Sequence, residues 1–128
     1  MLDHSCIIPE IGFGVYNVGE TVYECVRYAL DAGYRHIDTA AAYGNEAEVG
    51  RAIRESGIPR EELFVATKLW PTAFAKAEEA FLQSLLLLGL DYVDGYLLHW
   101  PGTDTGLRHR AWDTVLAYPT SCPSIWKI

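Results

Sequence analysis

The chain contains 128 residues, with 17 acidic and 10 basic side chains and a formal net charge of −7. This is the length of one ordinary domain, and a hydrophobic fraction of 50% gives enough apolar mass for a core, which excludes a disordered tail. The acidic balance argues against a nucleic-acid binder and against binding to anionic membranes, because both rely on Lys and Arg.

The sequence also lacks the marks of a membrane or secreted protein. Its longest apolar run, residues 85–90, is far shorter than the ~20 residues of a membrane span, and we expect no secretory signal at the start. Cys6, Cys25 and Cys122 are odd in number and widely spaced. We therefore expect reduced thiols in a cytoplasmic protein, with Cys25 packed as a small hydrophobe.

Short apolar runs alternate with segments of helical period, which is typical of strand–helix units around a parallel sheet. We predict strands at about residues 10–15, 34–38, 63–69 and 93–100. The sequence therefore predicts an α/β fold with about four βα units.

Two helices should follow the first two strands. The first begins at a capping box, in which the Thr21 hydroxyl and the Glu24 carboxylate each bond to the other residue's amide, and it ends at Gly33. The second has Asn45 as its N-cap and ends at Gly57.

Two further helices complete the predicted elements. The third runs from about residue 74 to 88 and ends at Gly89, and the fourth begins near Thr105. After about residue 117 the helical pattern is lost, which predicts an irregular tail over residues 118–128.

Each later strand ends in a residue that can do chemistry. Asp38, Lys68 and His99 stand at successive strand ends, and Tyr43 follows Asp38 in the next loop. Because the carboxyl ends of parallel strands meet at one edge of the sheet, these four side chains are expected to face one pocket.

This set suits proton transfer to a carbonyl oxygen. A neighbouring ammonium group favours the phenolate form of a tyrosine, and a paired carboxylate keeps that ammonium charged and in position. Lys68 and Asp38 would thus tune Tyr43 as a proton donor, while His99 would orient a carbonyl. None of these residues can supply hydride, so a reduction would need a cofactor. The histidines His4, His36 and His109 have no metal-binding spacing, and we expect no metal site.

Four motifs occur in order along the chain: Gly12-Phe13-Gly14, Asp38-Thr39-Ala40-Ala41-Ala42-Tyr43-Gly44-Asn45-Glu46, Thr67-Lys68-Leu69-Trp70 and Leu98-His99-Trp100-Pro101. Over approximately residues 8–117 this combination resembles the aldo-keto reductase superfamily. The resemblance implies a (β/α)8 TIM barrel that uses NADPH, less often NADH, to reduce aldehydes and ketones to alcohols.

The resemblance also implies roles for single residues. Tyr43 would be the general acid, Lys68 and Asp38 its tuning partners, and His99 the carbonyl-orienting donor. The cofactor would lie near Gly14, Val15, Tyr16 and Asp38, and the substrate would be walled by Tyr16, Trp70 and Trp100. The plainer alternatives are a structural ion pair for Asp38 and Lys68, and simple packing for the two tryptophans.

A complete barrel takes ~250 residues, so we expect residues 1–117 to form its N-terminal half, truncated and followed by a tail unrelated to the family. The family's second half supplies much of the cofactor site. We therefore expect the isolated chain to be weak or inactive as an enzyme. The alternative is a catalytically dead product, or a non-enzymatic half-barrel that forms a homodimer or binds a full-length relative.

Overall fold

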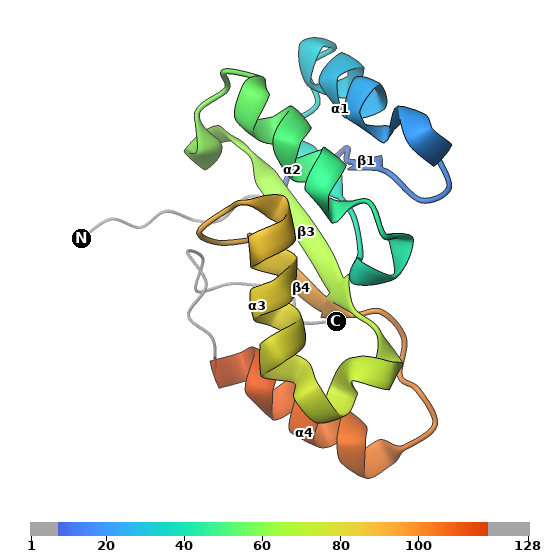
Figure 1. Ribbon diagram of the computed structural model, residues 1–128. Coiled ribbons are helices and arrows are strands. Elements are labelled where there is room, and N and C mark those ends of the chain that lie inside the picture. Colours follow the sequence, from blue (N-terminus) through green and yellow to red (C-terminus); the bar gives the residue numbers. More distant parts are fainter. Residues whose placement is uncertain (1–7, 118–128) are drawn as a thin grey trace, which may run out of the picture.

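The computed structural model describes residues 8–117 (Figure 1). Its strands are β1 (Phe13–Gly14), β2 (His36–Asp38), β3 (Phe64–Leu69) and β4 (Gly95–Leu98). All three neighbouring pairs are parallel, in the order β1-β2-β3-β4. The predicted succession of four parallel strands is confirmed, although the first strand is much shorter than expected.

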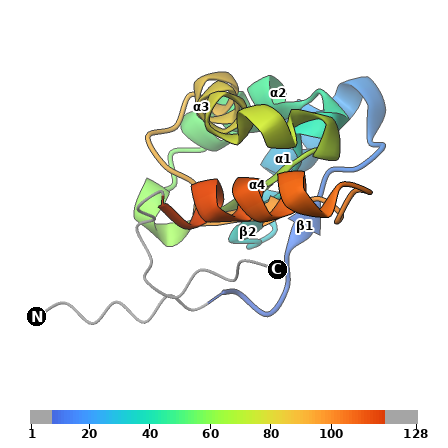
Figure 2. The ribbon, with the colours of Figure 1, turned by 90° about the horizontal axis from the view of Figure 1, so that it is seen from below.

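Four α-helices follow the strands in turn, and each of the last three packs against the helix before it. Figures 1 and 2 show α1, α2 and α3 side by side along one face of the sheet. The bounds are α1 Val22–Asp31, α2 Glu46–Glu55, α3 Ala77–Leu88 and α4 Thr105–Ala117. Short 3-10 helices lie at Gly19–Thr21, Ala41–Tyr43, Arg60–Glu62 and Pro71–Lys76.

The strand register separates the face that is buried against the helices from the face that carries Asp38 and Lys68. Ile37, Val65 and Leu69 are fully buried against the helices. Because side chains alternate along a strand, Asp38 and Lys68 stand on the opposite face of the sheet. Within residues 8–117, no helix has the length and apolar character needed to cross a membrane.

The predicted capping box at Thr21 is wrong. Thr21 does precede α1, but its hydroxyl makes no capping bond and donates instead to the carbonyl oxygen of Val18 at 3.0 Å. The reason is the 3-10 turn that leads directly into α1, which directs this side chain backward. Cys25, expected to pack as a small hydrophobe in this helix, is half-buried.

Asn45 stands at the N-terminus of α2 as predicted, but its side chain does not cap the helix. The Thr39 hydroxyl donates to Asn45 Oδ1 at 2.8 Å, and Asn45 Nδ2 donates to the carbonyl oxygen of Val15 at 3.1 Å. Thr39 and Val15 are both fully buried, so their polar atoms need partners inside the protein. Asn45 therefore joins the loops that follow β1 and β2.

The third predicted helix begins differently from the expectation. Residues Pro71–Lys76 form a 3-10 helix that contains the buried Phe74, and the α-helix starts only at Ala77. A proline at the first position suits a helix start because it has no amide hydrogen to leave unpaired. The predicted tail at residues 118–128, together with His4, Cys6 and Cys122, lies outside the described residues.

Two close contacts fix α2 against its neighbours. The carboxylate of Glu46, only 2% exposed, accepts hydrogen bonds from Thr67 of β3 at 2.5 Å and from Ser84 of α3 at 3.2 Å. At Gly50, a Cβ atom would lie 1.9 Å from the carbonyl oxygen of Leu88. The backbones of α2 and α3 therefore approach as closely as glycine allows.

Candidate active site

Asp38 and Lys68 form an ion pair at the carboxyl ends of β2 and β3. Lys68 Nζ lies 2.7 Å from Asp38 Oδ2 and donates a second hydrogen bond to the Thr39 carbonyl oxygen, also at 2.7 Å. The side chains are 14% exposed for Lys68 and 34% exposed for Asp38. The ammonium group is thus held in one position at the edge of the sheet.

Tyr43 lies beside this pair, at the end of the 3-10 turn Ala41–Tyr43. Its backbone amide donates to the Ala40 carbonyl oxygen at 3.0 Å. Lys68 Nζ lies 5.3 Å from the centre of the Tyr43 ring. The sequence predicted that these two side chains would lie close together. The ammonium group therefore sits within the electrostatic range of the phenol.

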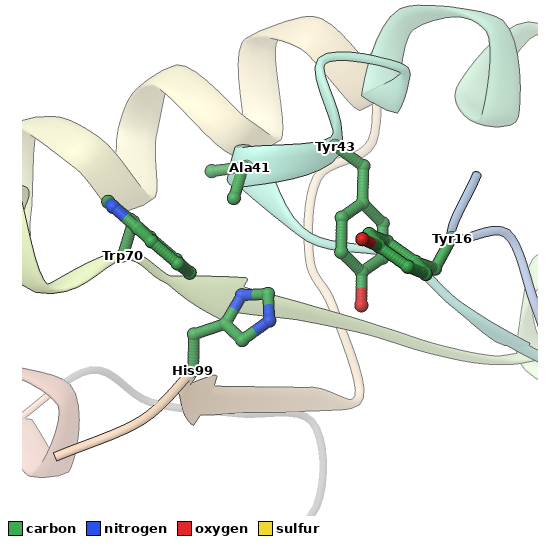
Figure 3. A pocket seen from close by; sticks show the side chains of 6 residues that line it. Tyr16, Ala41, Tyr43, Trp70 and His99 are labelled. Atoms are coloured by element: carbon green, nitrogen blue, oxygen red, sulfur yellow. The ribbon is translucent and has the colours of Figure 1, made fainter. Parts of the chain in front are cut away.

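His99 follows β4 and faces Tyr43 across the sheet edge (Figure 3). Its ring makes edge contacts with Tyr43, at 5.6 Å between ring centres, and with Trp70, at 5.0 Å. Its Nδ1 atom is buried and has no hydrogen-bond partner among residues 8–117. Burial and, second, the Lys68 charge lower the pKa of His99, against an opposing effect of Asp38, so the ring is neutral near neutral pH.

An open pocket of about 770 Å³ lies above these side chains. Tyr16 stands at its rim, 74% exposed, with its ring centre 5.2 Å from that of Tyr43. The lining is mainly aromatic, which suits a small, partly apolar ligand. Its six residues are Tyr16, Ala41, Ala42, Tyr43, Trp70 and His99 (Figure 3).

Trp100 takes a different place from the other predicted substrate residues. It packs against Trp70, with ring centres 6.1 Å apart, but does not line the pocket above Tyr43. Instead it borders a second cavity of about 610 Å³, where Lys68 and His99 also appear together with Arg108 of α4. This second cavity was not predicted from the sequence.

The four predicted cofactor residues also differ in how they could act. Gly14 pairs in register with Asp38, and nothing lies within 4 Å of the place where a Cβ atom would be, so its backbone is open to a ligand. Val15 is fully buried, and its amide donates to the Asp38 carbonyl oxygen at 3.1 Å. Val15 is therefore buried beneath the loop, whereas Gly14 and Tyr16 are exposed and Asp38, paired with Lys68, is partly exposed.

The residues that hold this site in place were not predicted from the sequence. Asn45, interpreted as a helix cap, and Thr39 fix the loop that carries Tyr43. Both residues lie in the same sequence motif as Asp38 and Tyr43, which was the one sign in the sequence that they belong to the site. Among residues 8–117, no group of three or more His, Cys, Asp or Glu side chains is arranged to hold a metal ion.

The sequence matches the Aldo/keto reductase family over residues 10–119. Because the match extends over most of the chain, and the fold and the motif residues agree with it, this chain belongs to the Aldo/keto reductase family.

Individual relatives are similar to the chain over the same region. It is 59% identical over 101 residues to glycerol 2-dehydrogenase (NADP(+)) of Saccharomyces cerevisiae, which covers 78% of the chain and 32% of the relative. It is 49% identical over 101 residues to methylglyoxal reductase DkgA of Escherichia coli, covering 78% of the chain and 37% of that protein. The chain thus spans about a third of the length of these curated relatives.

Solved structures agree with this relationship. An aldo/keto reductase from Brucella melitensis matches with a TM-score of 0.81 and 46% identity, over 85% of this chain and 44% of that one. A deep-sea metagenome aldo-keto reductase, MGS-M4, matches with a TM-score of 0.78 and 50% identity, over 86% of this chain and 42% of that one. The four parallel strands and their helices are therefore part of the expected (β/α)8 barrel.

Proposed function

We propose that this chain carries the proton-donating part of an NADPH-dependent reductase site, which converts small aldehydes or ketones to alcohols. The observation that carries the proposal is the convergence of Asp38, Tyr43, Lys68 and His99 on one sheet edge, beneath an aromatic pocket. The chain's membership of the Aldo/keto reductase family supports the same chemistry.

In this proposal Tyr43 donates the proton. Its Oη–H passes a proton to the carbonyl oxygen as that oxygen gains negative charge, and the Lys68 ammonium stabilises the phenolate left behind. Asp38 holds the Lys68 ammonium group in position through the 2.7 Å ion pair. A structural ion pair alone would not need a phenol beside it.

His99 orients the carbonyl group. A neutral imidazole carries one N–H, and the lowered pKa of His99 keeps the ring in that form. With Nδ1 buried, the other ring nitrogen, Nε2, is the one we assign to the substrate oxygen. Donation from this nitrogen and from Tyr43 Oη would hold the oxygen between two groups.

The residues around Gly14 and Asp38 fit part of a nicotinamide nucleotide. The open backbone at Gly14, next to the half-exposed carboxylate of Asp38, leaves room for a flat ring and an acceptor for ribose hydroxyls. When bound, NADPH would supply hydride to the carbonyl carbon. Tyr16 would border the nicotinamide, and buried Val15 would support the loop. We favour NADPH over NADH because the yeast relative is named for NADP(+).

The pocket lining favours a small carbonyl substrate. Tyr16 and Trp70 form apolar walls around Tyr43, and the Trp100 ring packs against that of Trp70. The names of the yeast and Escherichia coli relatives, a glycerol dehydrogenase and a methylglyoxal reductase, point to compact oxygenated substrates. We place this chemistry in the cytoplasm, since the widely spaced cysteines suit a reducing compartment.

The test is NADPH oxidation by the purified chain with a small aldehyde, at cofactor concentrations that saturate binding measured by fluorescence titration. We expect slow turnover that Tyr43→Phe abolishes. Tyr28→Phe, at an exposed tyrosine on α1, is the matched control and should leave the rate unchanged. A wild-type chain that binds NADPH but shows no turnover above background, or activity that survives Tyr43→Phe, would contradict the proposal.

A second candidate function rests on the sheet ends. Among the described residues β1 and β4 each pair on one side only, and the chain spans about a third of its curated relatives. We propose as the alternative that this sheet joins a complementary one, from a second copy or a longer relative, without catalysis. A complex whose assembly is unaffected by Tyr43→Phe, and which lacks NADPH binding, would favour this function.

A further inference from the structure

The imidazole ring of His99 has no hydrogen bond that orients it from behind. The backbone amide of His99 donates to the Leu69 carbonyl oxygen at 2.9 Å, which fixes the main chain just after β4. The buried Nδ1 atom of the ring, in contrast, has no hydrogen-bond partner among residues 8–117. In many histidine sites a bond at one ring nitrogen decides the orientation of the ring and the position of its proton. For His99 another contact has to do this.

Two aromatic rings pack against this imidazole. The ring centre of Trp70 lies 5.0 Å from that of His99 with the planes at 89°, and the ring centre of Tyr43 lies 5.6 Å away with the planes at 84°. Perpendicular contacts of this kind are favoured between aromatic rings. In Figure 3 the Nδ1 side of the His99 ring is turned toward Trp70, and the Nε2 side is turned toward Tyr43.

Trp70 is itself held in place by contacts that do not involve His99. It directly follows β3 in an extended conformation, and Pro71 begins the 3-10 helix after it. Its carbonyl oxygen accepts a hydrogen bond from the Ala73 amide at 2.9 Å, and its ring packs against that of Trp100 at 6.1 Å between ring centres. Trp70 therefore offers His99 a fixed surface.

The burial of Nδ1 also decides which ring nitrogen carries the proton. A neutral imidazole has one N–H group, on either Nδ1 or Nε2. A proton on Nδ1 of His99 would be a buried donor without an acceptor among residues 8–117, which is costly. A proton on Nε2 can instead reach the pocket. Because Trp70 covers the Nδ1 side, this ring keeps water from satisfying the unfavourable form.

We propose that Trp70 is a positioning residue for His99, which holds the imidazole ring and, by keeping water from Nδ1, places its single proton on Nε2. This role is additional to that of a wall of the pocket. In the proposed reductase site it makes Nε2 of His99 a ready donor to the carbonyl oxygen. The catalytic meaning of the inference rests on the proposed function, whereas the proton position can be measured without any turnover.

The first test is nitrogen NMR of the chain labelled at its histidine rings, at a pH where they are neutral. The His99 signals are identified by their loss in His99→Gln. We expect the wild type to carry the proton on Nε2, Trp70→Leu to show a mixture of both forms, and Trp70→Phe to restore most of the wild-type spectrum. Tyr28→Leu, at a residue 72% exposed on α1, is the control and should change nothing.

Two results of this measurement would overturn the inference. One is a wild-type His99 with its proton on Nδ1, which can be observed without a variant and so does not depend on whether Trp70→Leu folds. The other is a folded Trp70→Leu chain whose His99 signals match those of the wild type. A wild-type chain without turnover would contradict the proposed function alone, because the spectrum would still decide the role of Trp70.

The second test separates positioning from a simple wall by NADPH oxidation with acetaldehyde and with benzaldehyde. Because both share the carbonyl oxygen, Trp70→Leu should lower kcat roughly tenfold or more for each, and Trp70→Phe should recover most of the loss. In a His99→Gln background, Trp70→Leu should have little further effect. A rise in KM for benzaldehyde alone, or an equal loss of kcat in both backgrounds, would contradict the positioning role.

Discussion

Glu46 and Thr67 are joined by a 2.5 Å hydrogen bond between two buried side chains. Glu46 begins α2, three residues after Tyr43, and Thr67 immediately precedes Lys68 in β3. The bond therefore connects the segment that carries the phenol to the strand that carries the ammonium group. It lies on the helix side of the sheet, away from the pocket.

Removing this bond should lower stability. Thr67→Val keeps the shape of the side chain but leaves the buried Glu46 carboxylate with only the Ser84 hydroxyl as a side-chain donor among the described bonds. We expect the free energy of unfolding in urea to fall by about 1–3 kcal/mol. Thr103→Val, at an exposed position, should change it by less than about 0.5 kcal/mol. Equal effects of the two substitutions would show that the buried bond is not stabilising.

Two glycine-to-alanine substitutions should act in opposite directions. At Gly50 a methyl group would overlap the Leu88 carbonyl oxygen, so Gly50→Ala must push α2 and α3 apart and should cost about 1–3 kcal/mol or more. Gly106 lies in the first turn of α4, and a Cβ atom added there would meet no atom closer than 3.4 Å. Gly106→Ala should therefore be neutral or stabilise by up to about 1 kcal/mol. Thermal unfolding of both variants measures the contrast.

Lys68 should be more important for turnover than for folding. Lys68→Met removes the charge beside Tyr43 and leaves Asp38 without its ion-pair partner, so any NADPH-dependent aldehyde reduction should fall roughly 10²-fold or more. Lys76→Met is the control, because Lys76 makes only an exposed pair with Glu79. A rate for Lys68→Met within a factor of two of wild type would rule out the assigned role.

Stability should decrease in mild acid, partly because of His36. Burial lowers the pKa of His36 below its ordinary value of 6.5, although Asp38 and Asp94 favour the charged form and Lys68 opposes it. The unfolded chain then takes up a proton before the folded protein does, so this part of the stability is present above pH 6.5 and is lost as the pH falls through the folded value.

The check is the urea midpoint at about pH 7 and about pH 5 for wild type and His36→Phe. The substitution should reduce the loss of stability between the two values, and His109→Gln, at an exposed histidine, should not. His99, whose pKa is also lowered, adds to the same trend, so some dependence should persist in His36→Phe. An unchanged pH dependence would show that His36 protonation is not coupled to unfolding.

The parts of the fold set by local pattern could be predicted from the sequence. Apolar runs located β2, β3 and β4, and glycines located the helix ends, as at Gly33 and Gly89, which both have positive φ angles. Because parallel strands end at one edge of the sheet, it could also be predicted that Asp38 and Lys68 lie close together, as they do in the ion pair. These features depend on residue spacing along the chain, and few alternative contacts compete with them.

The parts that depend on competition between partners could not be predicted. Thr21 and Asn45 are residue types that often cap helices, but neither caps a helix here. Thr21 donates to the preceding Val18 carbonyl oxygen. Asn45 bonds to the Thr39 hydroxyl and to the backbone of Val15. Similarly, the sequence did not distinguish Trp70, which lines the pocket, from Trp100, which supports it. A local motif reports which bonds a side chain can make, whereas burial of its neighbours decides which one it makes.

The hydrogen bonds of Asn45 separate the residues that hold the Tyr43 loop from the residues that line the pocket. Its amide anchors the Tyr43 loop to the backbone of Val15 and to Thr39, both beneath the pocket and neither part of its aromatic wall. Tyr16 and Trp70 can consequently be exchanged for side chains of other sizes without disturbing the bonds that locate the phenol.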